Sequence, residues 1–188
     1  RLGHVIDIKE DKLRVYQRMN ASDEIIELAT ELFYSGLEPM VKYRLLKKHV
    51  SAEKWPDFSD QLLTDSRNYP WRDVNAEIFI EEKKWDKLMD WVLENTRLSS
   101  QHDDAEPYDK YLVKHCPDRF LEMYRVRLSN YPLNHMGRAH YRFMVAIMQR
   151  LQTYPGGKAV VRNLVELYRA YYRNRPALMD ELNQKYKN

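Results

Sequence analysis

The chain has 188 residues, of which 44% are hydrophobic and 31% charged, and its formal net charge is +3. A domain of this length buries about 70% of its unfolded surface, which is enough for one hydrophobic core. The composition excludes a disordered tail, and no apolar run reaches the roughly 18 residues of a membrane-spanning helix. We therefore expect one soluble domain over residues 1–188.

The start of the chain and its single cysteine bear on its origin. The opening stretch RLGHVIDIKEDKLRVYQRMN lacks an initiating methionine and the basic-then-apolar layout of a signal peptide. We interpret the chain as the C-terminal fragment of a longer polypeptide. Cys116 is the only cysteine, which excludes an internal disulfide and is typical of a reducing compartment. The expected location is the cytoplasm.

The first strong helical signal lies between Ser22 and Gly36. Ser22 is the expected N-cap, because a serine side chain accepts hydrogen bonds from the first backbone N–H groups of a helix. Gly36 is expected to end the helix, since glycine adopts a left-handed conformation readily. The apolar positions follow the spacing that lines one side of a 3.6-residue helix: Ile25, Ile26, Leu28, Ala29, Leu32 and Phe33.

Two more helices and a break follow. A helix is predicted over 37–49, and another over 51–63 with Ser51 as its N-cap. Pro56 is compatible with that helix only in its first turn, because proline lacks an N–H group. Tyr69-Pro70 is then expected to break the chain.

The segment 72–95 is the clearest supersecondary unit. Its sequence RDVNAEIFIEEKKWDKLMDWVLEN predicts two helices joined by a tight polar turn near Lys83 and Lys84. Such a pair is expected to form a helical hairpin.

The rest of the chain alternates breaks and helices. The stretch SSQHDDAEP is the most loop-like, and a helix is expected from Tyr108 onward. Pro117 suits the first position of the next helix, and NYPLN, TYPGG and RNRP are expected to separate three more. Roughly nine or ten helices result, with short connections and no strict repeat. The predicted fold is all-α: stacked helical hairpins in a degenerate TPR- or HEAT-like α-solenoid.

The residue types that most often carry chemistry are few. One cysteine and six histidines are present, whereas a zinc site needs four clustered ligands. His135 and His140 have no third ligand nearby, so we interpret them as partly exposed helix histidines. Cys116 has no base beside it in the sequence and is expected to pack as a small hydrophobe. We expect no metal, no other cofactor and no catalytic activity.

Paired carboxylates and paired glycines are the remaining local motifs. Glu81-Glu82 and Asp103-Asp104 are expected to be solvated, because no apolar run beside them suggests the burial that raises a pKa. Gly156-Gly157 precedes a predicted helix in TYPGGKAVV and favours a turn. An anion held at the N-terminus of that helix is the alternative.

Positive charge is concentrated in the second half of the chain. Residues 1–104 hold 16 Lys and Arg against 21 Asp and Glu, whereas residues 105–188 hold 15 against 7, giving net charges of −5 and +8. Most of these later cations are arginines, whose guanidinium suits bidentate contact with phosphates and carboxylates. The arginines are expected to solvate outer helix faces; an acidic partner is the alternative.

Three segments of the second half carry a resemblance to a known family: YDKYLVKHCPDRFLEMYRVRL, GRAHYRFMVAIMQRLQTYPGG and RNRPALMDELNQ. They resemble the helical C-terminal region of bacterial proteins that carry a SWIM-type zinc finger, a region that ends in an RRPAL-like helix start, here residues 174–178. The likeness covers residues 20–188. The CxC and CxH pairs that define the zinc finger are absent from this chain. The resemblance implies a scaffold or partner-binding module with a nucleic-acid connection through the finger.

Two functions follow as hypotheses. The first is a non-catalytic helical-repeat scaffold or protein-interaction module whose concave face holds a segment of an unidentified protein. The chain has 14 Tyr and 4 Trp, residue types that are enriched at binding hot spots but that also pack between helices. The alternative is a nucleic-acid-associated module that binds through the Arg- and Tyr-rich half, residues 105–188. The candidate partner- or anion-binding residues, with the arginines on outward helix faces, are Arg138, Arg142, Arg169, Arg173, Tyr141 and Tyr172.

Overall fold

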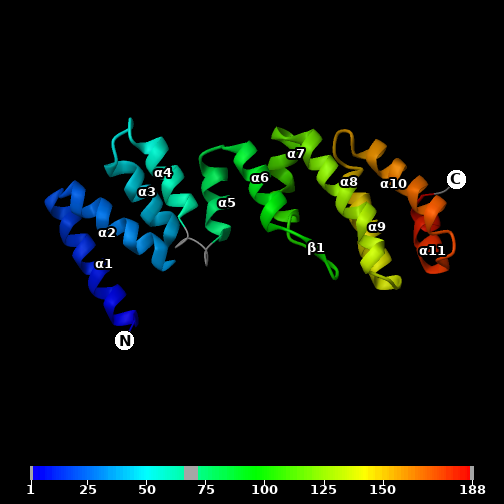
Figure 1. Ribbon diagram of the computed structural model, residues 1–188, viewed down its shortest axis with the longest axis horizontal. Helices are drawn as coiled ribbons and strands as arrows, with labels where there is room; N and C mark the ends of the chain where they lie inside the picture. Colours follow the sequence, from blue (N-terminus) through cyan, green and yellow to red (C-terminus); the bar gives the residue numbers. More distant parts are fainter. Residues whose placement is uncertain (1, 66–71, 187–188) are drawn as a thin grey trace. The chain divides into compact units, whose positions relative to one another are not determined.

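The computed structural model describes residues 2–65 and 72–186, with side chains for 5–65 and 73–186. Within these ranges the chain forms eleven α-helices, one short 3₁₀ helix and one two-stranded sheet, so the fold is all-α (Figure 1). No helix in the described part is long and apolar enough to cross a membrane. The chain divides into two compact units, 1–82 and 83–188.

The first unit contains five helices, of which α1 packs on α2, α2 on α3, and α3 on α5. Their bounds are α1 Leu2–Met19, α2 Ser22–Ser35, α3 Pro39–His49, α4 Trp55–Thr64 and α5 Arg72–Glu81. The core is built from the apolar stripes of these helices. Its fully buried large side chains are Ile25, Leu32, Phe33, Tyr43, Leu46 and Ile78.

Charged contacts fasten the outer helices of this unit to α3. Lys42 in α3 is buried and its Nζ lies 2.7 Å from Glu10 Oε1 in α1. Lys47 Nζ lies 2.6 Å from Glu82 Oε1, and Arg44 donates through Nε and Nη2 to Glu81 at 3.0 and 2.6 Å. The Glu81-Glu82 pair, expected to be simply solvated, is therefore held by cations of α3.

Of the two ends predicted for α2, the one at Gly36 is confirmed and the one at Ser22 is not. Gly36 ends α2 in a left-handed conformation, with φ of +77°, and its N–H bonds to Phe33 O, as predicted. The Ser22 N-cap prediction is wrong, because Ala21 occupies the N-cap position and Ser22 is already helical. The Ser22 hydroxyl instead lies 3.2 Å from His49 Nδ1 in α3.

The start of α4 also differs from the prediction. The helix begins at Trp55 with Lys54 at the N-cap, so Ser51 does not cap it with its side chain. The Ser51 carbonyl oxygen accepts the N–H groups of Lys54 and Trp55 in the preceding turn. Pro56 lies in the first turn, as predicted. Tyr69-Pro70 lies outside the described residues.

The segment 72–95 forms the two predicted helices, α5 and α6 (Trp85–Asn95), with Lys83 at a positive φ of 55° in the turn between them. The boundary between the two compact units falls in this turn. The packing of α5 and α6 as a hairpin stays a prediction.

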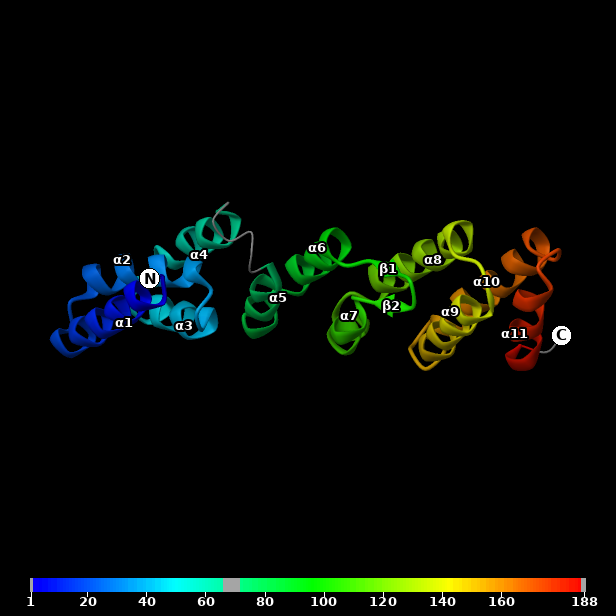
Figure 2. The same cartoon turned by 90° about the horizontal axis from the view of Figure 1, so that it is seen from below.

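The second unit contains α6 and five later helices (Figure 2). Here α7 packs on α6 and α8, α10 on α8 and α9, and α11 on α9. The stripe 141–151 of α9 faces the core, as its spacing predicts. The bounds are α7 Asp109–His115, α8 Pro117–Asn134, α9 Arg138–Leu151, α10 Gly157–Tyr171 and α11 Pro176–Lys185.

The stretch SSQHDDAEP is more ordered than a loop. Strand β1 (Leu98–Ser99) pairs antiparallel with β2 (His102–Asp103), with Leu98 opposite Asp103. Gln101 adopts a φ of +64° in the turn between the strands. The 3₁₀ helix η2 (Glu106–Tyr108) then leads into α7.

The break predicted at NYPLN is wrong, because α8 continues through Pro132 to Asn134. A proline inside a helix has no N–H to donate to the carbonyl four residues earlier, which here belongs to Leu128. The hydroxyl of Tyr168 in α10 donates to Leu128 O at 2.8 Å. A side chain 40 positions away thus replaces the missing backbone bond, and the helix continues.

Candidate functional site

A largely buried network of charged and phenolic groups, with Glu106 at its exposed edge, joins elements of the second unit. Arg150 of α9 is its hub: Nη2 contacts Asp103 and lies 2.9 Å from the Tyr124 hydroxyl, Nη1 lies 2.9 Å from Glu106, and Nε lies 3.0 Å from Asp109. The Tyr124 hydroxyl also lies 2.9 Å from one oxygen of each aspartate. The network therefore joins β2, η2, α7, α8 and α9.

Asp103 and Arg150 of the network, and Arg127 near it in α8, differ from the sequence-based expectation. The Asp103 side chain is 1% exposed, whereas it was expected to be solvated in a loop. Arg150 and Arg127 are partly buried and contact groups inside the unit, rather than lying on outer faces. Arg127 Nη2 donates to Thr96 O at 2.9 Å and to Val92 O at 3.2 Å, at the C-terminal end of α6. Both arginines therefore form hydrogen bonds or ion pairs with groups inside the unit.

Burial dominates the proton affinities in this network. It raises the pKa of Asp109 to about 6, although Arg150 and the Tyr124 hydroxyl lower it. Burial and the nearby Asp109 carboxylate also raise the pKa of Tyr124. Tyr124 is fully buried, and Asp103 and Asp109 nearly so. These groups are too buried for a site that is open to substrate. The network is better interpreted as a structural support in which one carboxyl group, that of Asp109, titrates near pH 6.

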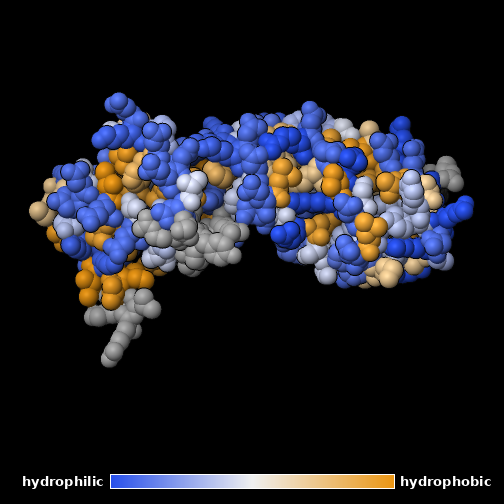
Figure 3. All heavy atoms as spheres, in the orientation of Figure 1, coloured by the Kyte–Doolittle hydropathy of each residue, from blue (hydrophilic) through white to orange (hydrophobic). Residues whose placement is uncertain are grey.

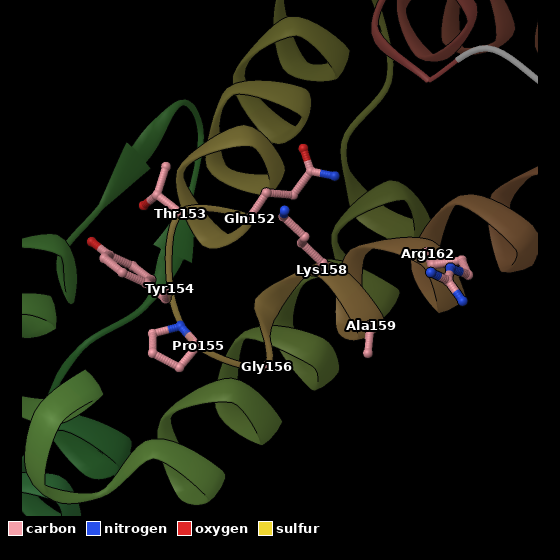
Figure 4. A pocket seen from close by; sticks show the side chains of 8 residues that line it. All are labelled: Gln152, Thr153, Tyr154, Pro155, Gly156, Lys158, Ala159 and Arg162. Carbon is pink, nitrogen blue, oxygen red and sulfur yellow. The ribbon is translucent and has the colours of Figure 1, made fainter.

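The surface next to this network carries a pocket of about 780 Å³ at the turn between α9 and α10. Figure 4 shows its side chains arranged around the turn and the first turns of α10. The lining residues are Gln152, Thr153, Tyr154, Pro155, Gly156, Lys158, Ala159 and Arg162.

Two glycines shape the turn at which the pocket lies. Gly156 is the N-cap of α10 with φ of +79°, a left-handed conformation that favours glycine. A Cβ on Gly157 would lie 1.8 Å from Leu151 O, so the start of α10 can approach the end of α9 only with glycine here. The turn predicted at TYPGG is confirmed, and the glycines explain its tightness.

Tyr154 connects the pocket to the buried network. Its hydroxyl donates to Asp109 Oδ2 at 3.4 Å, and its ring packs edge-on against Phe120, with centroids 5.6 Å apart. The wall of the pocket is therefore anchored to the charged network behind it.

The exposed cations of the pocket are Lys158 and Arg162. They are four residues apart in α10, and side chains at that spacing lie on the same helix face. Neither forms an ion pair with any residue in the described part of the chain. The first turn of α10 contains no acidic residue, although helix N-termini favour negative charge. The pocket is thus suited to a negatively charged group from outside the unit.

The arginines singled out in the sequence analysis are divided among several partners. Arg138 donates through Nη2 to Asp180 at 2.9 Å and through Nη1 to Glu181 at 3.0 Å, and Arg142 Nε also donates to Glu181 at 3.1 Å. These two arginines fasten α9 to α11. Their charges are balanced by the acidic residues of α11.

The other four candidates do not gather at one place. Tyr141 is 3% exposed and belongs to the core. Arg169 donates to Asn183 Oδ1 and Tyr186 O near α11. Tyr172 lies under the Arg175 guanidinium, 4.6 Å from ring centroid to carbon, whereas Arg173 is exposed and has no ion pair with a described residue. Lys158 and Arg162 were not among the predicted site residues, although the segment TYPGGKAVV, which contains Lys158, favoured a turn with an anion site as the alternative.

Packing explains the positions of His135, His140 and Cys116. His135 stacks on Tyr131 with centroids 4.1 Å apart, and His140 Nδ1 lies 2.9 Å from the Tyr131 hydroxyl. Cys116 is 8% exposed, and burial raises the pKa of its thiol. Over the described ranges, no group of three or more His, Cys, Asp or Glu side chains could hold a metal ion.

Comparisons with protein-family models, with curated proteins and with solved structures gave no match to this chain.

Proposed function

We propose that the protein is a non-catalytic interaction module of stacked helical hairpins, similar to degenerate TPR or HEAT solenoids, that works in the cytoplasm. Its pocket at the α9–α10 turn holds an acidic segment of a partner protein. The proposed relation to the helical region of SWIM-type zinc-finger proteins is compatible with a scaffold role. The observation that supports this proposal is that two exposed cations without ion-pair partners, Lys158 and Arg162, line the pocket.

The chemistry of the pocket favours carboxylates on a folded or extended peptide. Lys158 and Arg162 supply two charges about one helical turn apart, and Gln152 and Thr153 add hydrogen-bonding groups. Tyr154 and Pro155 supply apolar surface for the stem of an acidic side chain or a neighbouring apolar residue. The lining thus combines polar groups that can hold a carboxylate with apolar surface beside them.

The nucleic-acid alternative requires a continuous track of cations along a strand, with rings for the bases. Arg138 and Arg142, which would belong to such a track, are paired with Asp180 and Glu181. Tyr141 is buried and offers no ring for stacking. These contacts favour the protein-interaction function.

The test uses two fluorescein-labelled probes, a peptide of alternating glutamate and phenylalanine and a single-stranded oligothymidine, with binding followed by anisotropy. The double variant Lys158→Glu, Arg162→Glu is expected to abolish peptide binding. The matched control is Arg173→Glu, which also reverses an exposed, unpaired arginine but lies beyond the C-terminal end of α10. The proposal fails if the peptide does not bind, if the double variant binds it normally, or if only the oligonucleotide binds tightly.

A further inference from the structure

The first helix, α1, has one face packed within its unit. Leu13 is buried, Glu10 pairs with Lys42 of α3, and Lys9 pairs with Glu31 of α2. Together with the packing of α1 on α2, these contacts fix which side of the helix faces inward.

A second face of α1 presents apolar side chains to solvent. Val5, Ile8, Val15 and Met19 are 50%, 56%, 50% and 67% exposed. With Lys12 they are spaced alternately three and four residues apart, the spacing that forms the contact seam of a coiled coil. Figure 3 shows hydrophobic atoms at the surface of α1. Four exposed apolar side chains along one helix form a patch of the kind that marks an interaction site.

The charges beside this seam are divided by sign. Asp7, Asp11, Arg14 and Arg18 recur four, three and four residues apart, so they form a stripe along the helix, in which Asp11 and Arg18 lie next to seam residues. All four are exposed. The N-terminal half of the stripe is acidic and the C-terminal half is basic.

We propose that this face binds the same face of a second copy of the chain, with the two α1 helices antiparallel. An antiparallel arrangement brings Asp7 and Asp11 of each copy beside the basic half of the other copy. A parallel arrangement sets acid beside acid and base beside base, which is unfavourable. The face is therefore self-complementary under a two-fold axis, as a symmetric dimer requires.

Two details fit a reversible contact. Arg14 and Asp11 pair within one chain at 2.9 Å, but both are more than two-thirds exposed, so this pair is weak and can be exchanged for one between copies. Lys12 interrupts the apolar seam, and a single lysine at such a position fixes the register at a cost in affinity. Its methylene stem can still cover apolar surface while the ammonium group reaches water.

Sedimentation velocity over a dilution series tests the seam. The chain is expected to shift from a species of 22.8 kDa to one of twice that mass as its concentration rises. Ile8→Glu and Val15→Glu are each expected to weaken self-association by about 10-fold or more, because a charge enters the contact. Val126→Glu makes the same kind of change at another exposed valine and should leave it unaltered. A wild-type chain that stays at 22.8 kDa at every concentration, or seam variants that dimerise normally, overturns the proposal.

Charge reversal tests complementarity. One variant carries Asp7→Arg and Asp11→Arg, and the other carries Arg14→Asp and Arg18→Asp, so that the stripe of each variant has a single sign. Each variant alone is expected to lose self-association, and an equimolar mixture is expected to restore it. Self-association by either variant alone, or its absence from the mixture, contradicts the pairing of opposite halves.

Disulfide cross-linking tests the orientation. Chains with Ile8→Cys mixed with chains carrying Met19→Cys are expected to cross-link to each other under mild oxidation, because antiparallel helices bring opposite ends together. Cross-links between two chains of the same variant would instead show parallel helices and overturn the antiparallel arrangement. The unsubstituted chain, whose Cys116 is buried, serves as the control.

Discussion

Asp103 and Arg150 form an ion pair between a two-residue strand and the last turn of α9, 47 positions apart in the chain. The Asp103 carboxylate is also within hydrogen-bonding distance of the Tyr124 hydroxyl. The Asp103 side chain is 1% exposed and the Arg150 side chain 21%, so the charges are stabilised mainly by each other and by the phenol. The β hairpin is thereby fixed to the helices behind the pocket.

Removing the hub of this network should be costly. Arg150→Met leaves the buried Asp103 and Asp109 carboxylates without their cation, and we expect a loss of about 3 to 5 kcal/mol in the free energy of unfolding at pH 7. Urea unfolding followed by circular dichroism measures it. Arg125→Met, which breaks an exposed pair with Glu122, is the matched control and should cost less than about 1 kcal/mol. Equal losses in the two variants would contradict the buried role of Arg150.

The stability of the second unit should carry a pH dependence due to Asp109. Its pKa in the folded chain is about 6, above the ordinary value of 3.8, because of burial. Between pH 4 and 6 the folded state retains a proton that the unfolded state releases, so this contribution to stability is present at pH 4 and lost as the pH rises to 6. The difference in unfolding free energy between wild type and Asp109→Asn should fall by about 2 to 3 kcal/mol over that range. This difference should not change above pH 7. A difference that rises between pH 4 and pH 6 would contradict the raised pKa of Asp109.

The helices were predictable from sequence because their signals are local. The stripe 141–151 shows which side of α9 is buried, and the sequence around Gly36 shows where α2 ends. Leu164 belongs to the same class of prediction, since it lies in the apolar stripe of α10 and is 1% exposed.

Leu164→Ala should therefore lower the free energy of unfolding by about 2 to 5 kcal/mol, the usual cost of truncating a core leucine. Chemical unfolding measures the loss, and Leu133→Ala, at a side chain that is 61% exposed, should change it by less than about 0.5 kcal/mol. A small loss at Leu164 would mean that the stripe faces water.

The interior charges were not predictable, because their partners are distant in the chain. Asp103 stands in a polar stretch, and nothing beside it indicates Tyr124 or Arg150 as neighbours. The same holds for Pro132, whose compensating hydroxyl comes from Tyr168. The candidate pocket was predictable only in part. The glycine pair indicated a turn. Which cations form ion pairs, as Arg138 does, and which do not, as Lys158, depends on tertiary packing.

Binding to single-stranded oligonucleotides should be weak, independent of sequence and confined to low salt. Exposed cations of the second unit attract phosphates, but screening shortens to about 8 Å at physiological ionic strength. Anisotropy titrations at several salt concentrations measure it. Tight binding that survives physiological salt, and that Arg142→Ala with Arg173→Ala abolishes, would place the nucleic-acid function first.

Pro132 and Tyr168 should be energetically coupled. Tyr168→Phe leaves the buried Leu128 carbonyl without a donor and should cost about 1 to 3 kcal/mol. In a Pro132→Ala background the alanine N–H can bond to that carbonyl along the helix, so the same tyrosine change should cost less. A double-mutant cycle measured by urea unfolding gives the coupling energy. Additive costs would show that the hydroxyl does not replace the missing backbone bond.

The Pro132–Tyr168 contact also constrains the order in which the two positions can change during sequence divergence. A lineage that first replaces the proline regains a backbone donor and can then lose the tyrosine hydroxyl at little cost. A lineage that loses the hydroxyl first passes through a chain with an unpaired buried carbonyl. Related sequences are therefore expected to retain tyrosine at position 168 wherever position 132 is proline, and to vary there more freely where it is not.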